Sequence, residues 1–174
     1  MRALDYARLF GMYLVVIDAT GIGHTSRHHC AHCLRQTHNG KTIYYHMVLE
    51  AKLITPEGMV FSVGSEFVEN FDATATRQDC ELAAFPRLAT KIKQRFPRLP
   101  ICLLLDGLYA NQNIFTCCEQ YHWHWITTFK QGRLPTAFRE FQVLKSLCPR
   151  NMIETRERGR YQRLTWISDL EHEG

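Results

Sequence analysis

Asp18 and Asp106 each follow a short, fully apolar run of the sequence, residues 12–17 and residues 101–105. An apolar run without alternation is typical of a strand that is buried on both faces of a sheet. Ligand sites in α/β proteins lie at the carboxyl ends of parallel strands. The two carboxylates are therefore expected to face one cleft if these strands are neighbours.

Paired carboxylates at this position predict a divalent-metal site. Two such groups repel each other at close range unless a cation lies between them, and hard oxygen ligands select Mg²⁺ or Mn²⁺. A pair of metal ions serves phosphoryl transfer, because one ion activates the attacking water or 3′-hydroxyl and the other stabilises the leaving oxygen. We therefore predict that Asp18 and Asp106 are catalytic metal ligands. The alternative is that each only forms a turn, since Asp106 precedes Gly107.

Glu81 is a third carboxylate with the position of a metal ligand. It lies near the start of a helix predicted over residues 76–96, where apolar residues recur at spacings of three and four. Thr76 and Asp79 have the spacing of a capping box, and Pro97 ends the pattern. We include Glu81 as a metal ligand, and the alternative is an acidic residue that only stabilises the first turn of the helix.

The order of the expected elements predicts the fold class. Besides the two apolar strands and the helix, strands are expected at residues 42–54, 59–68, 123–129 and 161–167, and helices at residues 111–121 and 134–147. Residues 23–40 have no hydrophobic period and are expected to form a long loop. Three strands followed by alternating helices and strands predict an α/β fold, a mixed five-stranded sheet flanked by helices with the layout of RNase H-like domains. Residues 1–174 are expected to form a single domain.

The expected loop carries a cluster of zinc-ligand residue types. Cys30 and Cys33 have the Cys-x-x-Cys spacing of a zinc site, and imidazoles could complete a tetrahedron. The histidines of this segment are His24, His28, His29, His32 and His38. Cys80 could join only if the fold brings the helix start beside this loop. The alternative is a histidine-rich loop that faces DNA or has no fixed structure.

The charge of the chain is compatible with a polyanionic partner. The formal net charge is +4 with a sequence pI of about 8.7, which is a mild basic bias. Basic residues that we predict to contact DNA phosphates are Lys130, Arg133, Arg156, Arg158 and Arg160. Such contacts would make binding salt-dependent and largely independent of sequence. A solvated charged surface is the alternative.

The composition argues against a membrane protein and for reduced cysteines. The apolar runs are much shorter than the roughly 20 residues that cross a bilayer, and the first residues do not resemble a signal peptide. The cysteines number seven, which is odd, and two of them are adjacent. We therefore expect a cytoplasmic protein without a disulfide framework.

Several short motifs together resemble one family. They are Val16-Ile-Asp-Ala-Thr-Gly21, Cys30-Ala-His-Cys-Leu34, Tyr44-Tyr-His46, Ser65-Glu-Phe-Val68, Arg77-Gln-Asp-Cys-Glu81 and Leu105-Asp-Gly-Leu-Tyr109. From about residue 14 to residue 174 the chain is similar to the DDE transposases of bacterial insertion elements in the group related to IS4. The resemblance implies Asp18 on the first strand and Asp106 on the fourth as metal-binding catalytic residues. It also implies DNA as partner, both element ends and target, a homo-oligomer on DNA, and association with the nucleoid.

The third acidic residue of that family is a glutamate on a helix after the last strand. The chain resembles the family only up to the preceding strand, and its last acidic residues, Asp169, Glu171 and Glu173, are too close to that strand. We therefore expect a catalytic domain that lacks its C-terminal part. Two alternatives follow: an inactive remnant that still binds nucleic acid or metal, and an RNase H-like nuclease that stops after hydrolysis.

Overall fold

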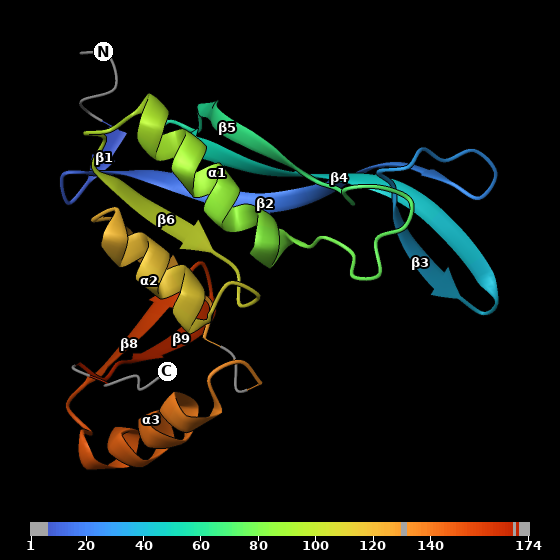
Figure 1. Cartoon of the computed structure of the whole chain (residues 1–174). Helices are drawn as coiled ribbons and strands as arrows, with labels where there is room; N and C mark the ends of the chain where they lie inside the picture. The colour runs from blue at the N-terminus through green and yellow to red at the C-terminus, as the bar shows by residue number, and fades with distance from the viewer. Residues whose placement is uncertain (1–6, 130–131, 169, 171–174) are drawn as a thin grey trace. The chain divides into compact units, whose positions relative to one another are not determined.

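The computed structural model describes residues 7–129, 132–168 and 170. Contacts divide the chain into two compact units, Met1–Thr127 and Thr128–Gly174, and each is described by itself. The first unit holds a mixed sheet and two helices, and the second holds one helix and a two-stranded hairpin (Figure 1). The predicted α/β class is confirmed. None of the helices among the described residues is long and apolar enough to cross a membrane.

The sheet of the first unit has seven strands instead of the predicted five. Its main path runs in the order β3-β4-β2-β6-β7, while β1 pairs with β2 and β5 pairs with β4. The strands are β1 (Arg8–Leu9), β2 (Met12–Thr25), β3 (Leu34–His38), β4 (Lys41–Ile54), β5 (Val60–Val68), β6 (Ile101–Leu105) and β7 (His124–Thr127). β2 is antiparallel to β4 and parallel to β6, and β6 is parallel to β7. The sheet is therefore mixed, as predicted.

The prediction of one long loop over residues 23–40 is wrong. β2 continues to Thr25, β3 occupies Leu34–His38, and both pair with β4. The second half of β2 and most of β3 are exposed, so their sequence lacks the apolar alternation that marks a half-buried strand. These two segments form strands because they pair with β4, and local sequence does not reveal that pairing.

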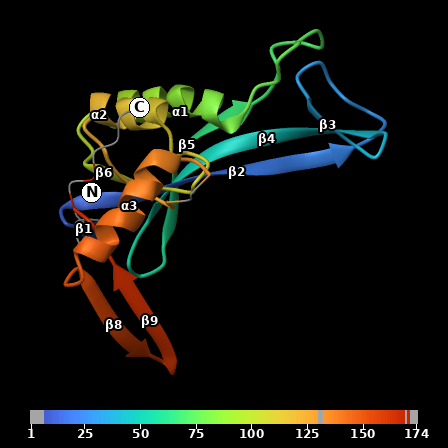
Figure 2. The ribbon, with the colours of Figure 1, turned by 90° about the horizontal axis from the view of Figure 1, so that it is seen from below.

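The helix α1 (Glu81–Arg95) covers one face of the sheet, with α2 (Gln112–Gln120) beside it (Figure 2). Its buried residues are Ala84, Phe85, Leu88, Ala89 and Ile92, and they join the core formed by β2, β4 and β6. Gly64 of β5 allows the close approach, because a Cβ there would lie 3.1 Å from Ile92 Cγ1. The sheet and α1 thus share one apolar core.

α1 begins at Glu81, five residues later than predicted, and the capping box is absent. Cys80 is the N-cap and makes no side-chain cap hydrogen bond. Asp79 instead accepts hydrogen bonds from Glu69 N and from the Arg87 guanidinium. The Asp79 carboxylate, which the sequence pattern assigned to the helix cap, is therefore bonded in a tertiary contact instead. The predicted second helix is confirmed as α2 (Gln112–Gln120), with Asn111 Oδ1 accepting from Ile114 N.

The second unit contains α3 (Pro135–Leu147), β8 (Met152–Glu157) and β9 (Arg160–Thr165). The strand predicted over residues 161–167 pairs with β8 and not with the large sheet. β8 was not predicted, because its charged sequence has no apolar run. Arg158 and Gly159 turn the hairpin with φ of 47° and 79°, the conformation of a tight two-residue turn.

Phe85→Ala is expected to lower the free energy of unfolding of the first unit by about 3–5 kcal/mol, since it would leave a large cavity under α1. Phe85 is 0% exposed. Phe71→Ala is the matched control, because Phe71 is 90% exposed and its truncation should change stability by less than about 0.5 kcal/mol. Urea denaturation measures both, and equal effects would contradict the assigned core.

Candidate carboxylate and metal sites

Asp18 lies within β2, and Asp106 directly follows β6, the neighbouring parallel strand. β2 and β6 pair in one register from Tyr13 with Ile101 to Val16 with Leu104. Extending that offset of 88 residues by two positions past the last pair would bring Asp106 opposite Asp18 (104 − 16 = 106 − 18 = 88). Both residues are exposed. The sequence expectation that the strands are neighbours is therefore confirmed.

Tyr109 links the aspartates to Glu81. Its hydroxyl donates a 2.8 Å hydrogen bond to Glu81 Oε2. Burial raises the pKa of the Tyr109 phenol above its usual value, and the carboxylates of Glu81, Asp106 and Asp18 raise it further. Tyr109 therefore remains a neutral donor, and it feels the negative charge of all three predicted ligands. Sequence analysis treated Tyr109 only as part of a motif, and its contact with Glu81 was not predicted.

Asp106 also forms the turn that the alternative explanation requires. Its Oδ1 accepts a 2.7 Å hydrogen bond from Leu108 N, and its carbonyl oxygen accepts from Thr127 Oγ1 at 2.9 Å. These bonds fix the loop after β6 to the end of β7. A turn role and a ligand role are compatible, because the turn uses only one of the two carboxylate oxygens.

The three carboxylates do not form a compact cluster. Across the described residues, one group of three or more Cys, His, Asp or Glu side chains has its ligand atoms within 4.8 Å of one another, and it is Cys30, Cys33 and His46. The acidic residues Asp169, Glu171 and Glu173 lie outside the described residues. Asp18, Asp106 and Glu81 are thus spread over a wider space than a single small ion requires.

Cys30, Cys33 and His46 form a group that could hold a metal ion. The two sulfurs are 3.6 Å apart, and His46 Nε2 lies 3.4 Å from each. The register of β3 and β4 explains the arrangement: Leu34 pairs with Tyr45, so the residue before Leu34 comes beside the residue after Tyr45. The sequence predicted both cysteines as zinc ligands but missed His46. Only the pairing of residue 33 with residue 46 could have indicated this histidine.

Three histidines of the Cys/His cluster have other partners. His24 stacks on Tyr45 and His29 stacks on Tyr44, while His32 Nδ1 contacts the carbonyl oxygen of Asn70 at 2.9 Å. Cys80 caps α1 and does not join the group formed by the described ligand residues. Cys80, which could have joined only if the fold brought it beside the two cysteines, is therefore not among the grouped ligands.

The predicted DNA contacts lie in the second unit. Arg133, Arg156, Arg158 and Arg160 are all exposed, and Arg158 and Arg160 line a hollow at the β8–β9 turn with Glu157 and Gln162. Lys130 lies outside the described residues. Exposure suits both phosphate contacts and an ordinary solvated surface, so the predicted role remains a prediction.

No family model, curated protein or solved structure matches this chain. The functional argument therefore depends on the geometry of its own residues.

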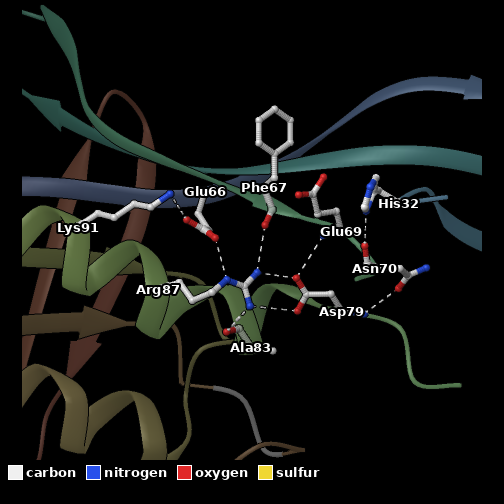
Figure 3. Close-up of polar contacts among 9 residues, drawn as sticks. All are labelled: His32, Glu66, Phe67, Glu69, Asn70, Asp79, Ala83, Arg87 and Lys91. Carbon is white, nitrogen blue, oxygen red and sulfur yellow. Dashed lines mark hydrogen bonds and ion pairs between the residues drawn. The ribbon is translucent and has the colours of Figure 1, made fainter. Parts of the chain in front are cut away.

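Arg87 fixes the start of α1, and with it Glu81, to β5 (Figure 3). Its Nε donates to Glu66 Oε1 at 2.7 Å, and its Nη2 donates to Asp79 Oδ2 at 2.6 Å and to the Phe67 carbonyl at 3.1 Å. Burial alone would raise the pKa of Glu66, but hydrogen bonds from Lys91 and Arg87 outweigh it and hold that pKa below its usual value. Arg87 Nη1 also donates to the Ala83 carbonyl at 3.1 Å, so two carboxylates and two carbonyl groups surround one guanidinium.

Arg87→Leu is expected to destabilise the first unit by about 1–3 kcal/mol at neutral pH, because it leaves two nearly buried carboxylates short of a donor. Glu66 titrates below its usual pKa in the folded chain, so its stabilising contribution is present above about pH 4 and is lost as the pH falls further. The difference between wild type and variant should therefore shrink in acid. Urea denaturation across pH measures it, with the exposed Arg98→Leu as control. A difference that is constant with pH would contradict this account.

Proposed function

We propose that the first unit is an RNase H-like catalytic core that carries out divalent-metal-dependent phosphoryl transfer on DNA, as in a DDE transposase. The observation that carries the proposal is the pairing of β2 with β6 in parallel, with Asp18 two residues after the last paired residue of β2 and Asp106 two residues after that of β6. Glu81 accepts a hydrogen bond from the Tyr109 hydroxyl, and Asp18 and Asp106 also act electrostatically on that hydroxyl. The sheet order supports the fold assignment, since antiparallel β5, β4 and β2 are followed by parallel β6 and β7.

The donor set of this site fits Mg²⁺ or Mn²⁺. Asp18, Asp106 and Glu81 offer carboxylate oxygens, which these hard cations prefer. Two-metal sites of this class hold their ions about 3.5–4 Å apart. When bound, the ions would activate the attacking hydroxyl or water and stabilise the leaving oxygen. Tyr109 holds the Glu81 carboxylate in one orientation by donating a hydrogen bond from its phenolic hydroxyl.

The Cys30, Cys33 and His46 group calls for a different ion. Thiolate and imidazole donors favour Zn²⁺ over Mg²⁺ or Mn²⁺. We therefore assign the carboxylates and the Cys/His group to separate metals, and only the carboxylates to phosphoryl transfer.

DNA is the substrate class that the proposal requires. The formal net charge is +4, and Arg133, Arg156, Arg158 and Arg160 expose guanidinium groups that can bind phosphates in bidentate fashion. Strand transfer would use a 3′-hydroxyl as nucleophile and need two copies on paired element ends. A nuclease would use water and stop after hydrolysis.

Mn²⁺ should bind the zinc-loaded chain, and the Asp18→Asn/Asp106→Asn variant should lose that binding because it removes both charged ligands. Isothermal titration in low salt measures it, and Asp72→Asn, an exposed aspartate bonded to Thr74, is the control that should bind as wild type does. In a DNA-cleavage assay the same double variant should lose Mg²⁺-dependent cleavage. Undiminished Mn²⁺ affinity in the double variant would show that the aspartates are turn residues, and products of joining rather than cleavage alone would identify a transposase.

Tyr109→Phe should weaken Mn²⁺ binding by roughly 10–100-fold, the range seen when a hydrogen bond to a metal ligand is removed. The substitution keeps the buried ring and deletes only the hydroxyl that Glu81 accepts from. Tyr121→Phe is the matched control, because its hydroxyl contacts Thr90 instead. Titration with Mn²⁺ compares them, and equal affinities would exclude Glu81 from the site.

A further inference from the structure

We propose that a zinc ion bound by Cys30, Cys33 and His46 clips the loop of residues 26–33 onto β4, and through that loop fixes the segment of residues 69–80 that leads into α1. This inference goes beyond phosphoryl transfer and does not depend on it. It rests on the distances within the group and on the hydrogen bonds that connect the loop to the segment.

The three ligand atoms have the spacing of one face of a zinc tetrahedron. Zn–S bonds of about 2.3 Å and Zn–N bonds of about 2.0 Å give edges of about 3.8 Å between sulfurs and about 3.5 Å between sulfur and nitrogen. The observed separations are 3.6 Å between the sulfurs and 3.4 Å from each sulfur to His46 Nε2. A disulfide would need sulfurs about 2.05 Å apart and would give His46 no reason to lie equally close to both.

The backbone of the loop turns between the two cysteines as a Cys-x-x-Cys ligand pair requires, with Cys33 N donating to Cys30 O at 3.4 Å.

The fourth position of the tetrahedron is open to solvent. Cys30 is exposed and His46 is half-buried. In the part of the chain that the structure describes, no further Cys, His, Asp or Glu joins the three ligands. Among the described residues, the fourth position of a bound zinc ion would thus be left to a solvent ligand.

Asn70 connects the zinc loop to the segment before α1. It is a buried polar residue, 6% exposed, and its side chain is bonded at both ends. Its Nδ2 donates to Cys33 O at 2.8 Å, and its Oδ1 accepts from Asp79 N at 3.2 Å. Asn70 N also donates to His32 O at 3.1 Å. Asp79 lies two residues before Glu81, so the ion and the first turn of α1 share one hydrogen-bonded chain.

A second bridge runs parallel to the first. Gln78 Nε2 donates to Arg35 O at 2.9 Å, and Gln78 Oε1 accepts from Arg35 N. Arg35 is the second residue of β3, directly after the Cys33-Leu34 pair. Loss of the ion would free the loop of residues 26–33 and loosen the Asn70 bridge, while the Gln78 bridge would still end on Arg35, which pairs with β4.

The first test is metal content. The 174-residue chain should bind one Zn²⁺ after chelator treatment and reconstitution, and Co²⁺ in its place should give the thiolate charge-transfer and visible bands of a tetrahedral site. Cys30→Ser and His46→Gln should each abolish stoichiometric binding and the cobalt bands. Cys80→Ser and His38→Ala, exposed residues outside the group, should retain both. Absence of zinc binding, or thiol titration showing a Cys30–Cys33 disulfide in the purified chain, would overturn the site.

The second test is hydrogen exchange with and without Zn²⁺. Removing the ion should speed exchange of the Arg35, Asn70 and Asp79 amides by at least tenfold, while amides of the β2–β6 core such as Leu103 stay unchanged. Zinc binding without any change at Asn70 and Asp79 would overturn the link to α1. Neither test uses DNA or Mn²⁺, so failure here is distinct from failure of the proposed phosphoryl transfer.

Discussion

The pairing of β2 on both sides is the constraint on which the first unit depends. β4 pairs with it in antiparallel fashion over nearly its whole length, and β6 pairs with its first half in parallel. The parallel partner brings the end of β6, and Asp106 after it, beside the strand that carries Asp18. The antiparallel partner continues past the core and creates the hairpin that carries Cys30, Cys33 and His46. One strand therefore positions two groups of different chemistry, hard oxygens at its middle and soft sulfur and nitrogen donors near its far end.

α1 supplies the third element of the carboxylate group, and its position is fixed by contacts that are distant in sequence. Gly64 lets the helix approach β5 closely, and Arg87 bonds to Glu66, Phe67 and Asp79. These contacts determine where the first turn lies and hence where Glu81 points. The carboxylate group is thus assembled by packing and ion pairing as much as by the strands.

The sequence predicted the parts of this fold that depend on local pattern. The buried runs before Asp18 and Asp106 and the apolar period of α1 are visible in residue order, because burial imposes it directly. The second half of β2, and the whole of β3 and β8, were not predicted. Their residues are exposed, and they form strands only because they pair with a neighbouring strand. His46 was missed for the same reason: its place beside Cys33 follows from strand register, which no local pattern encodes. The helix start was misplaced because Asp79 serves Arg87 and not the cap.

The position of β3 has a consequence for self-association. It lies at the end of the strand order, and such an edge offers unpaired backbone groups to any other extended chain. Four of its five residues are exposed, and after Leu34 its sequence is Arg-Gln-Thr-His. A charged and polar rim of this kind disfavours the addition of an apolar strand from a second molecule. The short length of β3 further limits the ladder that could form, so the long hairpin can extend beyond the core without becoming a template for aggregation.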